Sequence, residues 1–194
     1  MCKYKQINKR MTRNEFTWAP VEINTWDQIF KELQVLPNII VRKRPRFSPS
    51  VDLADYRCHV PSLFTWFNQM NLHPKVIAYV EQSAHTDMSI HSDITKPNLD
   101  NFDPELALNL PIQGCEEAYT VIYRSPTPPS LISTSSSTYH VYNLEELVEI
   151  DRYSLTEPVL FRIKHPHGVK NPTDCDRHSI SVRFWEDPWF LVDK

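Results

Sequence analysis

The chain has 194 residues and a mass of 22.9 kDa, a size typical of one compact domain. Its hydrophobic content of 41% and charged content of 23% are typical of a globular protein rather than a disordered one. Only two residues, Gly114 and Gly168, are glycines. This excludes the glycine-rich nucleotide loops and the G-x-S-x-G serine-hydrolase turn, because each needs a glycine cluster.

Several absences predict a soluble cytoplasmic protein, or one of the host cytoplasm if the chain is viral. Apolar runs such as Val76–Val80 are far shorter than the ~20 residues of a membrane span. Residues 1–15 form a basic tail with no apolar stretch behind it, unlike a signal peptide. The four cysteines lie far apart and are expected to be reduced thiols.

Charge is unevenly distributed along the chain. Residues 1–57 hold 11 Lys/Arg and 6 Asp/Glu, whereas residues 58–194 hold 10 and 18. The densest basic stretch, Arg42–Arg46, is typical of a solvated loop, and it could also bind phosphate or an acidic partner. Nucleic acid is therefore a partner that the sequence allows but does not favour.

The predicted elements begin with two helices, over residues 24–30, with Thr25 as N-cap and Gln28 as its capping-box partner, and over residues 62–67. Apolar runs, several with period-two alternation, then predict strands at 76–80, 88–91, 107–112, 119–123, 159–164 and 179–184. Ser125–Thr138 is predicted to be a surface loop and residues 143–148 a helical turn. The segments Ser125–Thr138 and Pro97–Pro104 are the candidate lids over a site. We expect a single α+β domain over 1–194, mainly β, built as a jelly roll with a core at 76–186 and supporting N-terminal helices.

A possible metal site comes from histidines and one aspartate on predicted strands. His91 and Asp93 are two residues apart, so on an extended chain their side chains point the same way. His167, near the end of a later strand, would complete a set of two histidines and one carboxylate, which is typical of non-haem Fe(II) oxygenases. The pair His85/Asp87 has the same spacing, and His165 is a rival for the third ligand. Surface histidines without any metal would give the same pattern.

An arginine near the third ligand suggests a carboxylate ligand as well. Arg177 follows His167 by ten residues, and a tight turn between them would return it beside the His167 strand. A guanidinium there would bind a carboxylate through two hydrogen bonds. An ordinary surface arginine at a strand start is the alternative.

Four segments resemble the 2-oxoglutarate/Fe(II)-dependent oxygenase superfamily, in particular its small phage and bacterial members. These are Ala107–Glu116, Tyr119–Tyr123, His167–Pro172 and Arg177–Phe184. The spacing of Arg177 and Arg183 is also similar to that of AlkB-type demethylases, but their N-x-Y before H-x-D is missing.

The resemblance implies a double-stranded β-helix and an oxygenase that couples oxidative decarboxylation of 2-oxoglutarate to oxidation of a small-molecule or side-chain substrate. It implies Fe(II) as the metal, with His91, Asp93 and His167 as ligands, and 2-oxoglutarate and O2 as cosubstrates. Arg177 would bind the distal carboxylate. The remaining cosubstrate-site and wall residues that it implies are Asn109, Tyr119, Tyr123 and Arg183. A purely structural role for the first three, and an outward-facing or ion-paired role for Arg183, are the alternatives.

Two other classes stay open from the sequence. A cupin-like metalloenzyme that does not use 2-oxoglutarate would keep the histidine and aspartate ligands and dispense with Arg177. A non-catalytic jelly-roll module would need neither the ligands nor the arginine. Binding of metal and 2-oxoglutarate therefore discriminates between the classes.

Overall fold

Antiparallel sheets are the main regular element of the structure, a computed structural model that describes residues 15–37, 53–93, 104–133 and 138–193. Two sheets form the body, and their strand orders are β1-β9-β4-β11-β2 and β3-β10-β5-β8. The first contains β1 (Trp18–Pro20), β9 (Val159–Arg162), β4 (Leu106–Gln113), β11 (Arg177–Phe184) and β2 (Pro74–Gln82). The second contains β3 (Thr86–Asp87), β10 (His167–Asn171), β5 (Tyr119–Arg124) and β8 (Val148–Ser154). The prediction of a mainly β, α+β fold is confirmed.

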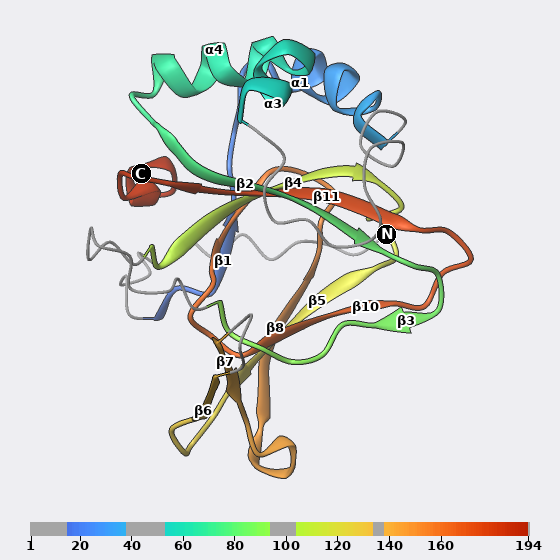
Figure 1. The fold of residues 1–194 in the computed structure, drawn as a ribbon, viewed down its shortest axis with the longest axis vertical. Coiled ribbons are helices and arrows are strands. Elements are labelled where there is room, and N and C mark those ends of the chain that lie inside the picture. Colours follow the sequence, from blue (N-terminus) through green and yellow to red (C-terminus); the bar gives the residue numbers. More distant parts are fainter. Residues whose placement is uncertain (1–14, 38–52, 94–103, 134–137, 194) are drawn as a thin grey trace.

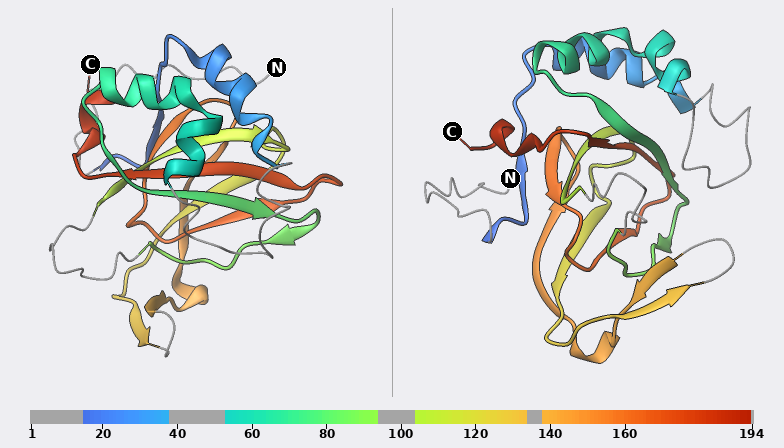
Figure 2. Two further views of the ribbon diagram at one scale, coloured as in Figure 1. Left: turned by 45° about the horizontal axis from the view of Figure 1, so that its top comes forward. Right: turned by 60° about the vertical axis from the view of Figure 1, so that its left-hand side comes forward.

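Helices cover the outer face of the five-stranded sheet, as Figures 1 and 2 show. They are α1 (Trp26–Leu33), α3 (Leu53–His59) and α4 (Pro61–Gln69). In α1, Ile29 and Leu33 are buried because residues four apart lie on one helix face. The predicted cap is wrong in detail, since the Thr25 side chain makes no capping hydrogen bond.

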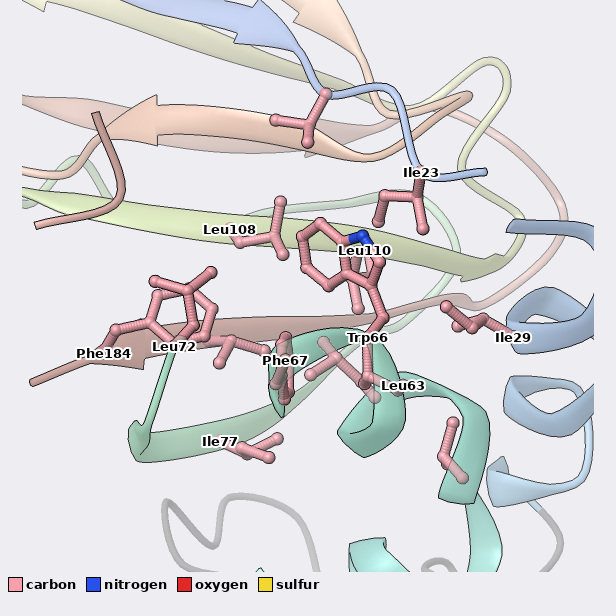
Figure 3. Packing of buried hydrophobic residues seen from close by; sticks show 14 of the residues in the cluster. Ile23, Ile29, Leu63, Trp66, Phe67, Leu72, Ile77, Leu108, Leu110 and Phe184 are labelled. Carbon is pink, nitrogen blue, oxygen red and sulfur yellow. The ribbon is translucent and has the colours of Figure 1, made fainter. Parts of the chain in front are cut away.

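The five-stranded sheet divides the apolar core into two parts. Helix α4 packs the aromatic rings of Trp66 and Phe67 against Leu108 and Leu110 of β4 and against Phe184 of β11 (Figure 3). The second part lies between the two sheets and contains residues of both. Its members are Ala107, Cys115, Ile122, Tyr153, Leu155, Val159, Phe161 and Ile163.

Strand β11 presents opposite chemistry to these two parts. Its even-numbered residues Ile180, Val182 and Phe184 belong to the core beneath the helices. Because side chains alternate along a strand, the odd-numbered residues face the space between the sheets. These are Arg177, Ser179, Ser181 and Arg183. A polar row therefore lines one wall of the interior.

A small third sheet projects from the body between β5 and β8. Strands β6 (Ser130–Ser133) and β7 (Thr138–Val141) form an antiparallel hairpin, which lies at the end of the molecule away from the helices (Figure 1). The expectation of a loop over Ser125–Thr138 is thus wrong at Ser130–Ser133 and at Thr138, which lie in strands. The helical turn expected after it is confirmed as η2 (Leu144–Glu146), where Asn143 Oδ1 accepts a hydrogen bond from the Glu145 amide.

Two further expectations concern segments near the chemistry. Strand β9 ends at Arg162 and a turn follows, so His167 begins a new strand instead of ending one. The basic stretch Arg42–Arg46 and most of Pro97–Pro104 lie outside the described residues. Among the helices of the described ranges, none has the length and apolar character to cross a membrane.

Candidate metal and carboxylate site

The segment after β3 runs along β10 and brings two distant histidines together. His91 and His167 form an isolated antiparallel bridge, in which each amide donates to the other residue's carbonyl, at 2.9 and 2.7 Å. Directly paired residues project from the same face of a sheet. The imidazole centroids are accordingly 4.5 Å apart.

Asp93 completes a three-residue group with these histidines. Its amide donates to the carbonyl of Ile163 at 3.0 Å, which fixes the chain two residues beyond His91. Asp93 Oδ1 lies 3.7 Å from His91 Nε2, and the ligand atoms of His91, Asp93 and His167 all lie within 4.8 Å of one another. The structure therefore brings together the three residues that the sequence singled out, and this geometry suits one metal ion.

Backbone carbonyls orient both imidazole rings. His91 Nδ1 lies 2.8 Å from the carbonyl of Ser89, and His167 Nδ1 lies 2.8 Å from the carbonyl of His165. A carbonyl oxygen only accepts, so each Nδ1 carries the proton and each Nε2 keeps a free lone pair. Such a bond is the usual support of a metal-binding histidine.

Burial keeps His167 neutral. The side chain has little contact with solvent. Its imidazole packs edge to face against the Phe161 ring, with 4.8 Å between the ring centroids. Burial, followed by repulsion from His91, lowers the pKa of His167 to about 4. The imidazole is thus unprotonated at neutral pH, as a metal ligand must be.

Two basic side chains hold Asp93. Arg183 Nη2 lies 2.7 Å from Asp93 Oδ2, and Lys164 Nζ donates to the Asp93 carbonyl at 3.2 Å. The sequence left open for Arg183 either a role toward the cosubstrate or substrate or an ion-paired role, and the structure places it in an ion pair with the aspartate. Because Arg183 occupies Oδ2, the other oxygen is left on the side of His91.

A second polar group lies further along the same wall. Arg177 is buried at 4% exposure, and its Nη1 donates to Ser179 Oγ at 3.2 Å, so the guanidinium reaches along β11 toward Arg183. On β4, Asn109 Nδ2 donates to Tyr153 OH at 3.2 Å. Within the described residues, Arg177 Nε and Asn109 Oδ1 are buried without hydrogen-bond partners.

These unpartnered atoms bear on whether a carboxylate fits. A buried guanidinium is costly unless an anion or several acceptors satisfy it. Arg177 has one hydroxyl partner among the described residues, so a carboxylate would satisfy donors that the protein leaves open. The donor set therefore fits the distal end of a dicarboxylate. The sequence predicted that a tight turn would return Arg177 beside the His167 strand. This is wrong, since β10 and β11 belong to different sheets and face each other across the core.

The remaining predicted residues lie elsewhere. Tyr119 and Tyr123 lie on β5 near Arg152, an exposed residue whose guanidinium packs over the Tyr119 ring at 5.4 Å. Residues paired with the His167 face of β10 are instead Thr120 and Ile122. We therefore withdraw Tyr119 and Tyr123 as wall residues, because side chains at these positions alternate to the outside of the sheet.

The rival ligands are also separate from the group. His85 is 64% exposed and pairs with Asp174 at 2.8 Å, while Asp87 faces Lys170 at 3.8 Å. His165 lies in the turn before β10, and its carbonyl orients His167. None of these three side chains joins the ligand group among the described residues.

Sequence reasoning missed Tyr153, Ser92, His140 and Tyr142, which contact the site residues or their neighbours. Strand β8, which carries Tyr153, has the sequence VEIDRYS, and its charged residues hide the strand pattern. The odd-numbered row on β11 was visible, since Arg177, Ser179, Ser181 and Arg183 alternate with apolar residues from 180 onward. That alternation was the available signal for a polar interior wall.

The fold and the ligand group together define a two-sheet β protein with a candidate His/Asp/His metal centre. No family model matches the chain, and no curated protein sequence matches it. Among solved structures, it is similar to HygX from Streptomyces hygroscopicus with nickel and 2-oxoglutarate bound, with a TM-score of 0.50 and 14% identity over 89% of this chain and 85% of that one.

Two more solved structures have comparable similarity. AviO1 from Streptomyces viridochromogenes Tue57 has a TM-score of 0.48 and 15% identity, over 89% of this chain and 90% of that one. A novel N-substituted L-amino acid dioxygenase from Burkholderia ambifaria AMMD has a TM-score of 0.49 and 14% identity, over 89% and 87%. At these identities the likeness concerns the fold. The chain has the double-stranded β-helix fold of HygX, and the predicted resemblance is confirmed at that level.

Proposed function

We propose that this chain is a non-haem Fe(II)- and 2-oxoglutarate-dependent oxygenase, with His91, Asp93 and His167 as the iron ligands. The observation that supports this most directly is the convergence of their ligand atoms within 4.8 Å. It occurs in a fold shared with HygX, which has been solved with 2-oxoglutarate bound. Two imidazoles and one carboxylate leave metal positions open for further ligands.

The residues around the ligands have defined tasks in this proposal. The carbonyls of Ser89 and His165 hold the two rings so that Nε2 faces the metal. Arg183 holds one oxygen of Asp93 and directs the other toward it. The Phe161 ring shields one side of His167 from water. These contacts preorganise the ligands before metal arrives.

Arg177 is the residue that would hold the distal carboxylate of 2-oxoglutarate, with Asn109 and Tyr153 beside it. The bound iron, 2-oxoglutarate and O2 supply oxidative decarboxylation to succinate and CO2, together with oxidation of a substrate C–H bond. The protein binds and orients the cosubstrate in a buried setting, where a guanidinium–carboxylate pair is strong. A cupin-like enzyme without 2-oxoglutarate would have no use for this arginine.

The test is an anaerobic titration of Fe(II), then 2-oxoglutarate, followed by measurement of succinate after O2 is admitted. We expect wild type to bind both and to release succinate. His167→Ala should lose the metal, and Arg177→Gln should keep it but bind 2-oxoglutarate at least tenfold more weakly, since a charge-assisted pair contributes roughly 1.5–3 kcal/mol.

Matched controls use exposed residues of the same kind. His85→Ala removes the rival histidine, and Arg152→Gln removes an arginine that is exposed on β8. Both should bind metal and 2-oxoglutarate as wild type does. Metal binding without 2-oxoglutarate binding in wild type would favour the cupin-like alternative, and binding of neither would refute the proposal.

A further inference from the structure

Ser92 lies between two of the candidate ligands and points away from them. Successive side chains alternate on an extended chain, so Ser92 is directed to the opposite side from His91 and Asp93. It is only 4% exposed. Its hydroxyl therefore needs partners within the protein.

Those partners are His140 and Tyr142. Tyr142 OH donates to Ser92 Oγ at 2.7 Å, and Ser92 Oγ lies 2.7 Å from His140 Nδ1. Because Ser92 Oγ accepts the Tyr142 hydrogen bond through one lone pair, its own hydroxyl proton can be donated to Nδ1 of a neutral His140. The two rings also pack edge to face, with centroids 6.2 Å apart. The three side chains form one hydrogen-bonded unit.

The partners come from a separate part of the fold. His140 belongs to β7, and Tyr142 follows it, so both lie about 50 residues beyond Ser92 in the sequence, at separations of 48 and 50. The β6–β7 hairpin that carries them extends from the body, as two views show (Figures 1 and 2). Its contact with Ser92 connects it to the metal-ligand segment.

The position of Ser92 makes this contact relevant to the ligands. His91 is held by its bridge to His167, and Asp93 by its amide bond to Ile163. Ser92 is the single residue between these two anchors. Its φ and ψ angles set the orientation of one candidate ligand relative to the other. Its side chain is held by the hydrogen bonds to His140 and Tyr142.

We propose that His140 and Tyr142 are positioning residues that act through Ser92 to fix the relative orientation of His91 and Asp93. The proposal rests on the proposed function, because it assumes that these two side chains bind a metal. It assigns the hairpin a defined task at the site, although neither His140 nor Tyr142 belongs to the ligand group.

The experiment titrates Co(II) alone into the apo protein, with the whole 194-residue chain present, and records the visible absorption spectrum of the bound metal. Tyr142→Phe removes one oxygen, and His140→Leu removes the ring nitrogens. Partners that orient metal ligands contribute roughly 10–100-fold to affinity, and Ser92 acts one step further away, so we expect about tenfold weaker binding. The absorption bands should also change, because they report ligand geometry.

Two further variants make the result specific. His140→Asn restores a polar atom near the position of Nδ1 and should recover affinity toward wild type. Thr127→Val is the matched control, because it breaks a 2.8 Å hydrogen bond to Glu146 elsewhere in the segment between β5 and β8. It should leave both the affinity and the spectrum unchanged. Thermal unfolding of each apo protein reports stability separately.

The outcomes separate the two proposals. If wild type binds Co(II), and Tyr142→Phe and His140→Leu bind it with wild-type affinity and spectrum, the positioning role is refuted while the proposed function stands. If wild type does not bind Co(II), the proposed function itself fails. A loss of apo stability with an unchanged spectrum and affinity also refutes positioning. If His140→Leu does not fold, Tyr142→Phe decides the question, since it changes a single atom.

Discussion

The buried imidazole of His167 predicts how the metal-free protein responds to acid. Burial and repulsion from His91 lower the pKa of this histidine to about 4, whereas an exposed histidine titrates near 6.5. Between these two pH values, His167 is therefore protonated in the unfolded chain and neutral in the folded chain. The stability due to neutral His167 is complete above pH 6.5 and is lost as the pH falls toward 4.

The size of the effect follows from the two pKa values. Between pH 7.5 and pH 5.0, protonation of this one residue in the unfolded state lowers the free energy of unfolding by about 2 kcal/mol. His165 and His178, whose pKa values burial also lowers, add to the total in the same direction. A comparison with His167→Gln isolates the His167 site, because the contributions of His165 and His178 are common to both proteins.

The assay is urea unfolding followed by tryptophan fluorescence at the two pH values, with EDTA present so that no metal competes with the proton. We expect His167→Gln to lose about 2 kcal/mol less than wild type on acidification. His85→Gln shows the effect of losing a histidine that is 64% exposed. Equal losses in wild type and His167→Gln would refute the assignment of His167 as a buried neutral imidazole.

Three further predictions concern the core, a turn and the ligand support. Leu108→Ala should lower the free energy of unfolding by about 3 kcal/mol, because the side chain is fully buried, whereas Leu144→Ala, at 65% exposure, should change it by less than about 0.5 kcal/mol in urea titrations. Gly114→Ala should cost about 2–4 kcal/mol by the same measurement, because φ is +63° and a Cβ would meet a backbone carbonyl. Arg183→Gln should weaken Co(II) binding roughly 10–100-fold while the apo protein remains folded, and wild-type affinity would show that Asp93 needs no such support.

The sequence predicted the elements whose own pattern is strong. Helix α4 was visible from its four bulky residues, and β4 and β11 from their alternation. The His91/Asp93 pair was visible because two residues of an extended chain share a face. In each case the signal is local.

The missed features depend on distant partners. Strand β8 has few apolar residues and forms by pairing with β5. The β6 and β7 strands are only four residues long each, and they form by pairing with each other. The placement of Arg177 on the sheet opposite the His167 strand follows from which strands β11 pairs with, which a sequence pattern does not specify.

The two glycines show how local chemistry and distant pairing meet at the candidate site. A Cβ at Gly168 would lie 3.1 Å from the Met88 carbonyl and 3.3 Å from Ile90 Cγ1, so its absence lets the segment before His91 lie against β10. A Cβ at Gly114 would approach the backbone of residues 176–177, where Arg177 begins β11. In a chain that has only these two glycines, each permits a close backbone contact beside a segment that carries a candidate ligand or Arg177. The segment that carries His91 therefore occupies the space beside Gly168. This close approach brings His91 and Asp93 next to His167, the third residue of the candidate metal centre.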